Sequence, residues 1–178
     1  LGTENAVINL GTIHAMQGKF WSQALFDFRA QSSFDPQITV TQAYSRELLR
    51  RLRAGQLDVV ICSRVGDMKG LQYSLCWSQS LVLGVNRKHP LAQRKNVSLG
   101  ELKGIELLSY NPNSPVTEGL KSLAESYDLD VHYAYDDEIT LSSIVAADPS
   151  HVALFCYSFL ISAFDDVVCL PIREAPVD

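Results

Sequence analysis

The chain has 178 residues, which is enough for one ordinary core or for two small lobes. Its formal net charge of −5 argues against direct binding to nucleic acid, because a duplex is bound by a basic face. Hydrophobic residues make up 47% of the chain, yet no apolar stretch reaches the length of a membrane span, so the composition predicts a soluble globular protein with no membrane partner.

The first third of the chain alternates between strand-like and helix-like patterns. These patterns predict strands over 6–13, 37–42 and 57–62, with helices over 20–28 and 45–53 between them. Gly55 follows the second helix, where a left-handed residue is expected. The third strand is apolar except for Asp58, and such a nearly continuous apolar run predicts a strand that is buried on both faces. Together these elements form a βαβαβ unit, for which right-handed crossovers are expected.

After Arg64 the pattern changes and then returns to alternation. Two strand-like runs within 70–86 are joined by Ser-Gln-Ser, and a polar loop with a short helical turn follows. The remaining elements are expected in the order strand, helix, strand, helix, strand, short helix and strand, over 105–110, 114–129, 131–135, 139–148, 151–156, 157–164 and 166–172. This is a second α/β unit. Because no flexible linker precedes it, the chain is predicted to form two lobes joined by extended strands.

Ligands of such sheets sit at the carboxyl ends of the strands, where helix N-termini offer unpaired amides. Ser45 is expected to cap the second helix, and its hydroxyl can also contact an anion. Arg64 is either a forked partner of a carboxylate or a solvated residue beside a crossover. His14 is either a ligand contact or an ordinary loop residue.

A turn-rich segment, NPNSPVTEG over 111–119, precedes the next helix. Ser114 and Pro115 fit the N-cap and first helical positions, which leaves the amides of Val116 and Thr117 to form an anion pocket. Every helix start shares some of these features, so a purely structural role stays open. The acidic run 136–138 lies before a helix, where it complements the dipole.

Catalytic and metal-binding patterns are missing from the sequence. No nucleophile with a nearby base, no phosphate loop and no G-x-S-x-G is present, so no catalytic residue, metal or cofactor is predicted. The four cysteines form no C-x-x-C pair, which favours small buried thiols in a reducing cytoplasm over redox or metal roles. The first twelve residues do not have the pattern of a signal peptide.

Several segments together resemble a known family. LRAGQLDVVICS at 52–63, followed by LVLGVNRKHPLAQRKNVSLGEL at 81–102, resembles the effector-binding domain of LysR-type transcriptional regulators. INLGTI, the Asp35-Pro36 turn before QITV, and SIVAAD before VALFC follow in the expected order. The resemblance covers nearly the whole chain.

This resemblance implies the two-lobed fold of type 2 periplasmic binding proteins, with two crossover strands and a small effector in the cleft. Subdomain I would comprise 1–64 plus 157–178, and subdomain II 65–156. The family's cleft positions fall on residues that the strand-end argument also selects, with Thr140 and Cys156 added from that argument. The predicted ligand-binding residues are His14, Ala15, Tyr44, Ser45, Ser63, Arg64, Ser114, Pro115, Val116, Thr140 and Cys156.

Three departures from the family pattern stand out. The N-terminal winged helix-turn-helix is absent from this chain, so DNA would be bound only through that missing domain. DPSH at 148–151 replaces the usual Gly-x-Gly, and Phe155-Cys156 replaces the following proline, which places the cleft near Cys156 in doubt. The family also adds a strand and a helix beyond the last residue here.

The resulting hypothesis is a bacterial, cytoplasmic ligand sensor that is not an enzyme. A small anionic effector would change the geometry of a homo-oligomer, a dimer or tetramer, and so control transcription. The broad apolar face formed by Phe20, Trp21, Leu25, Phe26 and Phe28 would suit an interface, although burial within the monomer also explains it. Two alternatives remain: a periplasmic solute-binding protein of a transporter, and an enzyme on the same fold.

Overall fold

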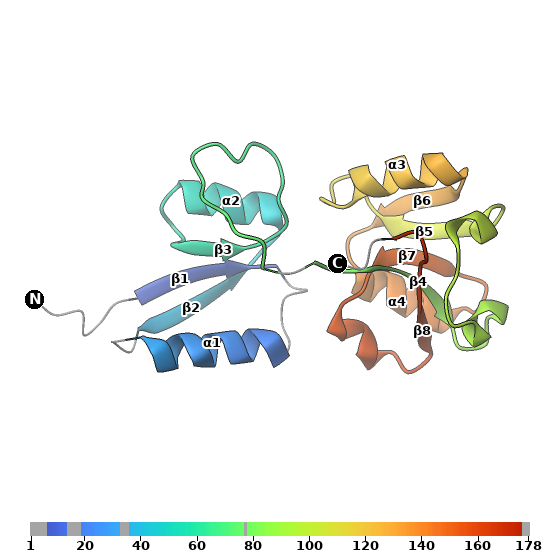
Figure 1. Ribbon diagram of the computed structural model, residues 1–178, viewed down its shortest axis with the longest axis horizontal. Coiled ribbons are helices and arrows are strands. Elements are labelled where there is room, and N and C mark those ends of the chain that lie inside the picture. The colour runs from blue at the N-terminus through green and yellow to red at the C-terminus, as the bar shows by residue number, and fades with distance from the viewer. Residues whose placement is uncertain (1–6, 14–18, 33–35, 77, 176–178) are drawn as a thin grey trace, which may run out of the picture. The chain divides into compact units, whose positions relative to one another are not determined.

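The computed structural model describes residues 7–13, 19–32, 36–76 and 78–175. The chain divides into two compact units, Leu1–Gln72 (the first unit) and Tyr73–Asp178 (the second unit). Each contains its own sheet (Figure 1). In the described residues no helix is both long and apolar enough to span a bilayer.

The first unit is the predicted βαβαβ unit. Its three parallel strands are β1 (Val7–Thr12), β2 (Gln37–Gln42) and β3 (Val59–Ile61), in the order β2-β1-β3. They alternate with α1 (Lys19–Gln31) and α2 (Ser45–Arg53). The connections β1–β2 and β2–β3 run in opposite directions across the sheet, so right-handed crossovers place the two helices on opposite faces (Figure 1).

Helix α2 approaches β1 closely because Gly11 has no side chain. A Cβ atom at Gly11 would lie 2.7 Å from Leu57 Cδ1 and 2.8 Å from Leu48 Cδ2. Leu48 is fully buried and Leu49 nearly so. The helix stops as predicted, since Gly55 follows it with a φ of 68° in the left-handed region.

Strand β3 is less covered than the sequence predicts. It is an edge strand of the described sheet, paired only with β1, and Val59 keeps 45% of its surface exposed. The expectation of burial on both faces is therefore wrong. Asp58 instead binds the neighbouring strand, because its carboxylate accepts the Asn9 backbone amide at 2.7 Å.

The second unit is a five-stranded mixed sheet in the order β6-β5-β7-β4-β8. Strands β6, β5 and β7 are parallel, and β4 runs antiparallel to both β7 and β8. The strands are β4 (Leu81–Asn86), β5 (Glu106–Tyr110), β6 (Asp130–Tyr135), β7 (Val152–Cys156) and β8 (Val167–Pro171). The helices are α3 (Thr117–Tyr127) and α4 (Glu138–Ala147), with 3-10 helices η2 (Pro90–Gln93), η3 (Leu99–Leu102) and η4 (Phe159–Ala163).

The core of the second unit lies around the two central strands. Leu83, Val85, Val152 and Phe155 have essentially no exposed surface. The Phe155 ring lies against Gly84, where an added Cβ atom would come within 2.4 Å of the ring. Strand β4 can be buried along almost its whole length because it has partners on both edges and α4 packs on it.

Two predictions differ from the observed architecture. Residues 71–76 form no strand, and Leu75 is 85% exposed. Residues 157–178 were predicted to return to the first subdomain, whereas β8 pairs with β4 and the whole segment from Tyr73 belongs to the second unit. The apolar β4 offers a second edge beside it, and β8 satisfies the backbone groups of that edge.

Candidate functional site

In the first unit, the carboxyl ends of β2 and β3 lie next to the start of α2. Tyr44 is the N-cap residue of α2, and Ser45 lies in the first turn, so the prediction that Ser45 is the N-cap is wrong. The Ser45 hydroxyl instead accepts the backbone amide of Ser63, with an N···O distance of 3.2 Å. This bond joins two predicted ligand-binding residues across α2 and the segment after β3.

The Ser45 hydroxyl also forms a hydrogen bond with the neighbouring Cys62 thiol. Burial raises the pKa of the Cys62 thiol, and a hydrogen bond with Ser45 partly opposes that rise. Ser45 itself is only 4% exposed. The first-turn amides of Arg46 and Glu47, next to this buried serine, have no acceptor among the described residues.

The other predicted residues of this unit differ in exposure. Tyr44 is 64% exposed and Arg64 is exposed, while Ser63 is half-buried. His14 and Ala15 lie outside the described residues. Exposed aromatic and guanidinium groups beside a helix N-terminus are suited to an acidic ligand.

In the second unit, the three parallel strands end at one edge of the sheet. Tyr110 ends β5, Tyr135 ends β6 and Cys156 ends β7. The Tyr110 hydroxyl accepts the Cys156 backbone amide at 2.9 Å. The side chain of one strand end therefore fixes the backbone of another.

The loop after β5 is ordered by Asn111 rather than by a serine cap. The Asn111 side chain accepts the Asn113 amide at 2.8 Å, and its carbonyl accepts the Ser114 amide at 3.1 Å and the Thr117 hydroxyl at 2.7 Å. These bonds hold the chain in turns until Val116, which is the N-cap residue. The prediction that Ser114 and Pro115 begin the helix is wrong for this reason.

The start of α4 carries two carboxylates. Asp137 caps the helix by accepting the Thr140 amide at 2.7 Å. The amide of Thr140 is thus already occupied, and only its exposed side chain is left for a ligand. Glu138, the next residue, is only 8% exposed.

Charge and burial act together at this edge. The pKa of the Cys156 thiol is raised from 9.0 to about 11, by burial first and then by the Glu138 charge, with a hydrogen bond with Tyr110 opposing the rise. The pKa of Tyr110 is also raised, by burial first and then by neighbouring negative charge. The Glu138 charge therefore acts on two strand ends, Tyr110 and Cys156.

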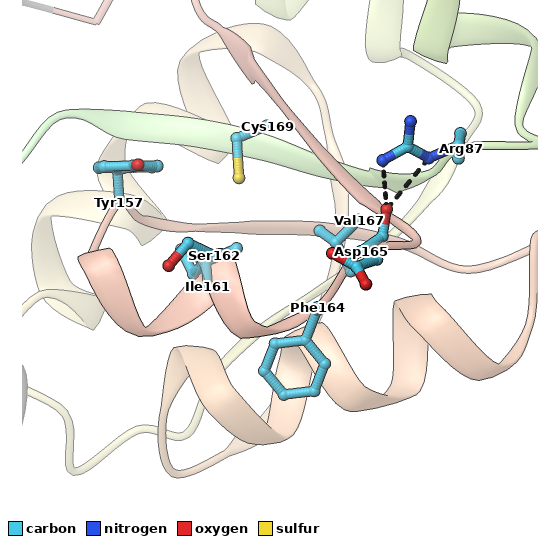
Figure 2. Close-up of a pocket in the computed structure, with 8 residues that line it drawn as sticks. All are labelled: Arg87, Tyr157, Ile161, Ser162, Phe164, Asp165, Val167 and Cys169. Carbon is cyan, nitrogen blue, oxygen red and sulfur yellow. Dashed lines mark hydrogen bonds between the residues drawn. The ribbon is translucent and has the colours of Figure 1, made fainter.

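A separate hollow of about 320 Å³ lies elsewhere on the second unit (Figure 2). Arg87, Tyr157, Ser162, Asp165 and Cys169 are among the residues lining it. The Arg87 guanidinium donates twice to the Asp165 carbonyl, once at 3.0 Å through Nε, as the dashed lines in Figure 2 show. Arg87 thus holds a turn, and none of the predicted ligand-binding residues lines the hollow.

No binding role was predicted from the sequence for Tyr110 or for Glu138, which was interpreted only as part of the acidic run 136–138. The helical spacing of the sequence could have predicted that Glu138 is buried. This residue falls at the i, i+3, i+4, i+7 spacing with Leu141, Ser142 and Val145, and these four residues form the buried face of α4. A glutamate on such a stripe is buried, and burial of a charge is the unusual feature.

Two solved structures of effector-binding or regulatory domains have a fold similar to that of this chain. The chain superposes on the effector-binding domain of QuiR in complex with shikimate with a TM-score of 0.82 and 19% identity, covering 96% of this chain and 82% of that one. For the regulatory domain of CcmR from Synechocystis PCC6803 in complex with 2-PG, the TM-score is 0.77 and the identity 18%, over 97% and 83% of the two chains. The fold is that of LysR effector-binding domains, the type 2 periplasmic-binding-protein-like class with two α/β lobes.

The family follows from the sequence match. Residues 2–154 match the model of the LysR substrate binding domain, so the chain belongs to this family, which is part of transcriptional regulators and not enzymatic. The HTH-type transcriptional regulator YybE of Bacillus subtilis (strain 168) is 24% identical over 151 residues. That match covers 83% of this chain but 51% of YybE, so the chain spans about half the length of this relative.

Proposed function

We propose that the chain is the sensing domain of a bacterial, cytoplasmic regulator and that it binds a small acidic metabolite at the carboxyl ends of its strands. The supporting observation is the bond between the Ser45 hydroxyl and the Ser63 amide, which holds a helix start and a strand end together beside Arg64. First-turn amides and a guanidinium are the groups that recognise a carboxylate. Ser114, Pro115, Val116, Thr140 and Cys156 are proposed as contacts in the second unit.

DNA binding and oligomerisation complete the proposal. A helix-turn-helix segment outside this chain binds DNA, and the effector changes the arrangement of a homo-oligomer through unequal affinity for two states. Exposed aromatic residues on α1 support an oligomer, because Phe26 is 67% and Phe28 43% exposed. Large exposed aromatics on one helix favour a contact with another surface.

The test is a thermal-shift panel of small carboxylic acids that begins with shikimate and 2-PG. The acid that raises the melting temperature most is then titrated by calorimetry into the wild-type chain and into Arg64→Ala. We expect Arg64→Ala to weaken binding by at least about 1.5 kcal/mol, the contribution of a charge-assisted hydrogen bond.

Arg29→Ala is the matched control, since it removes an exposed guanidinium from the last turn of α1. Equal affinities of wild type and Arg64→Ala would remove Arg64 from the site. A panel without any thermal shift would contradict effector binding at these loops.

A periplasmic solute-binding protein is the second candidate function, because the fold is shared. The four cysteines favour the regulator, since Cys62, Cys76, Cys156 and Cys169 are all free thiols. Quantitative alkylation of four thiols in protein from native cytosol would support the regulator, whereas recovery in a periplasmic fraction would support the alternative.

A further inference from the structure

A buried carboxylate without a partner lies at the strand-end edge of the second unit. Glu138 is 8% exposed, and its carboxylate has no hydrogen bond or ion pair with another described residue. Three described side-chain atoms are both fully enclosed and without a hydrogen-bond partner: Ser142 Oγ, His151 Nδ1 and Ser158 Oγ. The Glu138 oxygens are not among them. The oxygens of this buried residue are therefore not fully enclosed.

Helix capping does not explain this carboxylate. Asp137 already caps α4 through the Thr140 amide. A second negative charge gains a little from the helix dipole, but that gain is much smaller than the cost of burying an unpaired charge. Buried charges are retained where something neutralises them.

No described cation acts on the two residues whose pKa the Glu138 charge raises. These residues are Tyr110 and Cys156, and the groups acting on them include no lysine, arginine or histidine. Both neighbours are held in place, since the Cys156 amide donates to the Tyr110 hydroxyl at 2.9 Å. An ammonium group in a ligand would supply the positive partner that the Glu138 carboxylate lacks among the described residues.

We propose that Glu138 binds the protonated amine of a small zwitterionic effector, with an ammonium group on the Glu138 carboxylate and an acid group on backbone amides. This inference rests on the proposed function, because it takes the strand-end edge to be the effector site. The amides of Glu118 and Gly119 in the first turn of α3 donate to no described residue, so they are available to donate to the acid group. This proposal restricts the class of candidate effectors from small acids in general to acids that carry an amine, such as amino acids.

Cys156 provides a direct probe of this site. In a variant with Cys62→Ser, Cys76→Ser and Cys169→Ser, the only thiol left lies beside Glu138. Its modification at pH 7 is timed with 2-aminoethyl methanethiosulfonate, a primary ammonium, and with the anionic 2-sulfonatoethyl reagent. A matched variant that keeps only the exposed Cys76 gives the reference ratio of the two rates.

We expect the cation-to-anion rate ratio at Cys156 to exceed that at Cys76 by at least about tenfold, because a nearby negative charge attracts one reagent and repels the other. Glu138→Gln, of the same shape, should bring the ratio to within about twofold of the reference. A ratio equal to the reference, a ratio unchanged by Glu138→Gln, or failure of both reagents to reach Cys156 would overturn the proposal. The first ratio needs no mutation at Glu138, and thermal melts of the single-cysteine variants beside the wild-type chain check that they fold.

These outcomes are separate from the test of effector binding. If Cys156 shows no cation preference but an acid raises the melting temperature, the effector is acidic and the proposed contact between Glu138 and an amine is wrong. A clear cation preference with no thermal shift from any acid would contradict the proposed function instead.

Discussion

The two units of the chain share a fold pattern but differ in how completely they are packed. In the second unit the strands β4, β5 and β7 are almost entirely buried, and Phe155, Leu83, Leu107 and Leu154 are essentially without exposed surface. In the described part of the first unit, Leu48 is the one large side chain buried to that degree. The second unit therefore has a large buried core, whereas the described part of the first unit fully buries few large side chains.

The exposed apolar residues of the first unit agree with this contrast. Val7, Val40 and Val59 are each more than two-fifths exposed, although all three lie in its sheet. Phe26 and Phe28 on α1 are exposed as well. A three-stranded sheet with two helices covers little surface, and small units of this kind are marginally stable alone.

The largest expected effect is in the core of the second unit. Phe155→Ala should lower the free energy of unfolding by about 3–5 kcal/mol, because the ring fills the space beside Gly84 and its removal leaves a cavity. Urea unfolding followed by circular dichroism measures this change. Phe159→Ala, at a 42% exposed aromatic, is the control and should change the free energy by less than about 1 kcal/mol.

The next effect concerns the apolar face of α1. Phe26→Ser should weaken self-association at least about tenfold, equivalent to about 1.4 kcal/mol, because it removes an exposed ring without touching a core. Sedimentation velocity across a concentration series measures the dissociation constant. An unchanged sedimentation profile would mean that the incomplete packing of the first unit is not related to assembly.

Two glycines provide a matched pair, one in each unit. Gly55 has a φ of 68°, so Gly55→Ala should cost roughly 1–2 kcal/mol of stability although space is available. Gly119 lies within α3 with no atom near an added Cβ, so Gly119→Ala should stabilise by about 0.5–1 kcal/mol. Thermal melts of both variants test this. Changes of the same sign would contradict the role given to Gly55.

The smallest effect is the pH dependence of α2. The Glu47 carboxylate accepts from Arg50 Nε and from Arg51 Nε, each at 2.7 Å, and these bonds lower its pKa from 4.5 to about 2. A folded-state pKa below the unfolded value stabilises the folded form above about pH 4.5, and this contribution is lost as the pH falls toward 2. Carboxyl NMR shifts of Glu47 between pH 5 and 2 check the direction. In Glu47→Gln the stability change over this window should be smaller than in wild type.

Much of this architecture could be predicted from residue patterns. Period-two alternation located β2, and helical spacing with Gly55 located α2 and its end. The strand predicted near 71–76 is absent. Apolar alternation shows that a segment could pack as a strand, but it does not show whether a partner strand is available to pair with it. The placement of β8 beside β4 depends on long-range pairing for the same reason.

The candidate site could be predicted to the level of loops but not of bonds. Ser45 was selected as a cap, and only the three-dimensional structure shows that its hydroxyl accepts the Ser63 amide 18 residues away. Ser114 looked like a helix start because local rules favour serine there, but Asn111 competes for the same backbone groups. Glu138 was interpreted by its charge alone, whereas its position on the buried stripe of α4 decides its environment.

The measurement that tests the central claim most directly is amide hydrogen exchange with and without the acid that gives the largest thermal shift. Protection is predicted in the first turn of α2, at Ser63 and in the loop 111–117, with none around the hollow between Tyr157 and Cys169. Protection confined to that hollow, with the strand-end loops unchanged, would contradict the account.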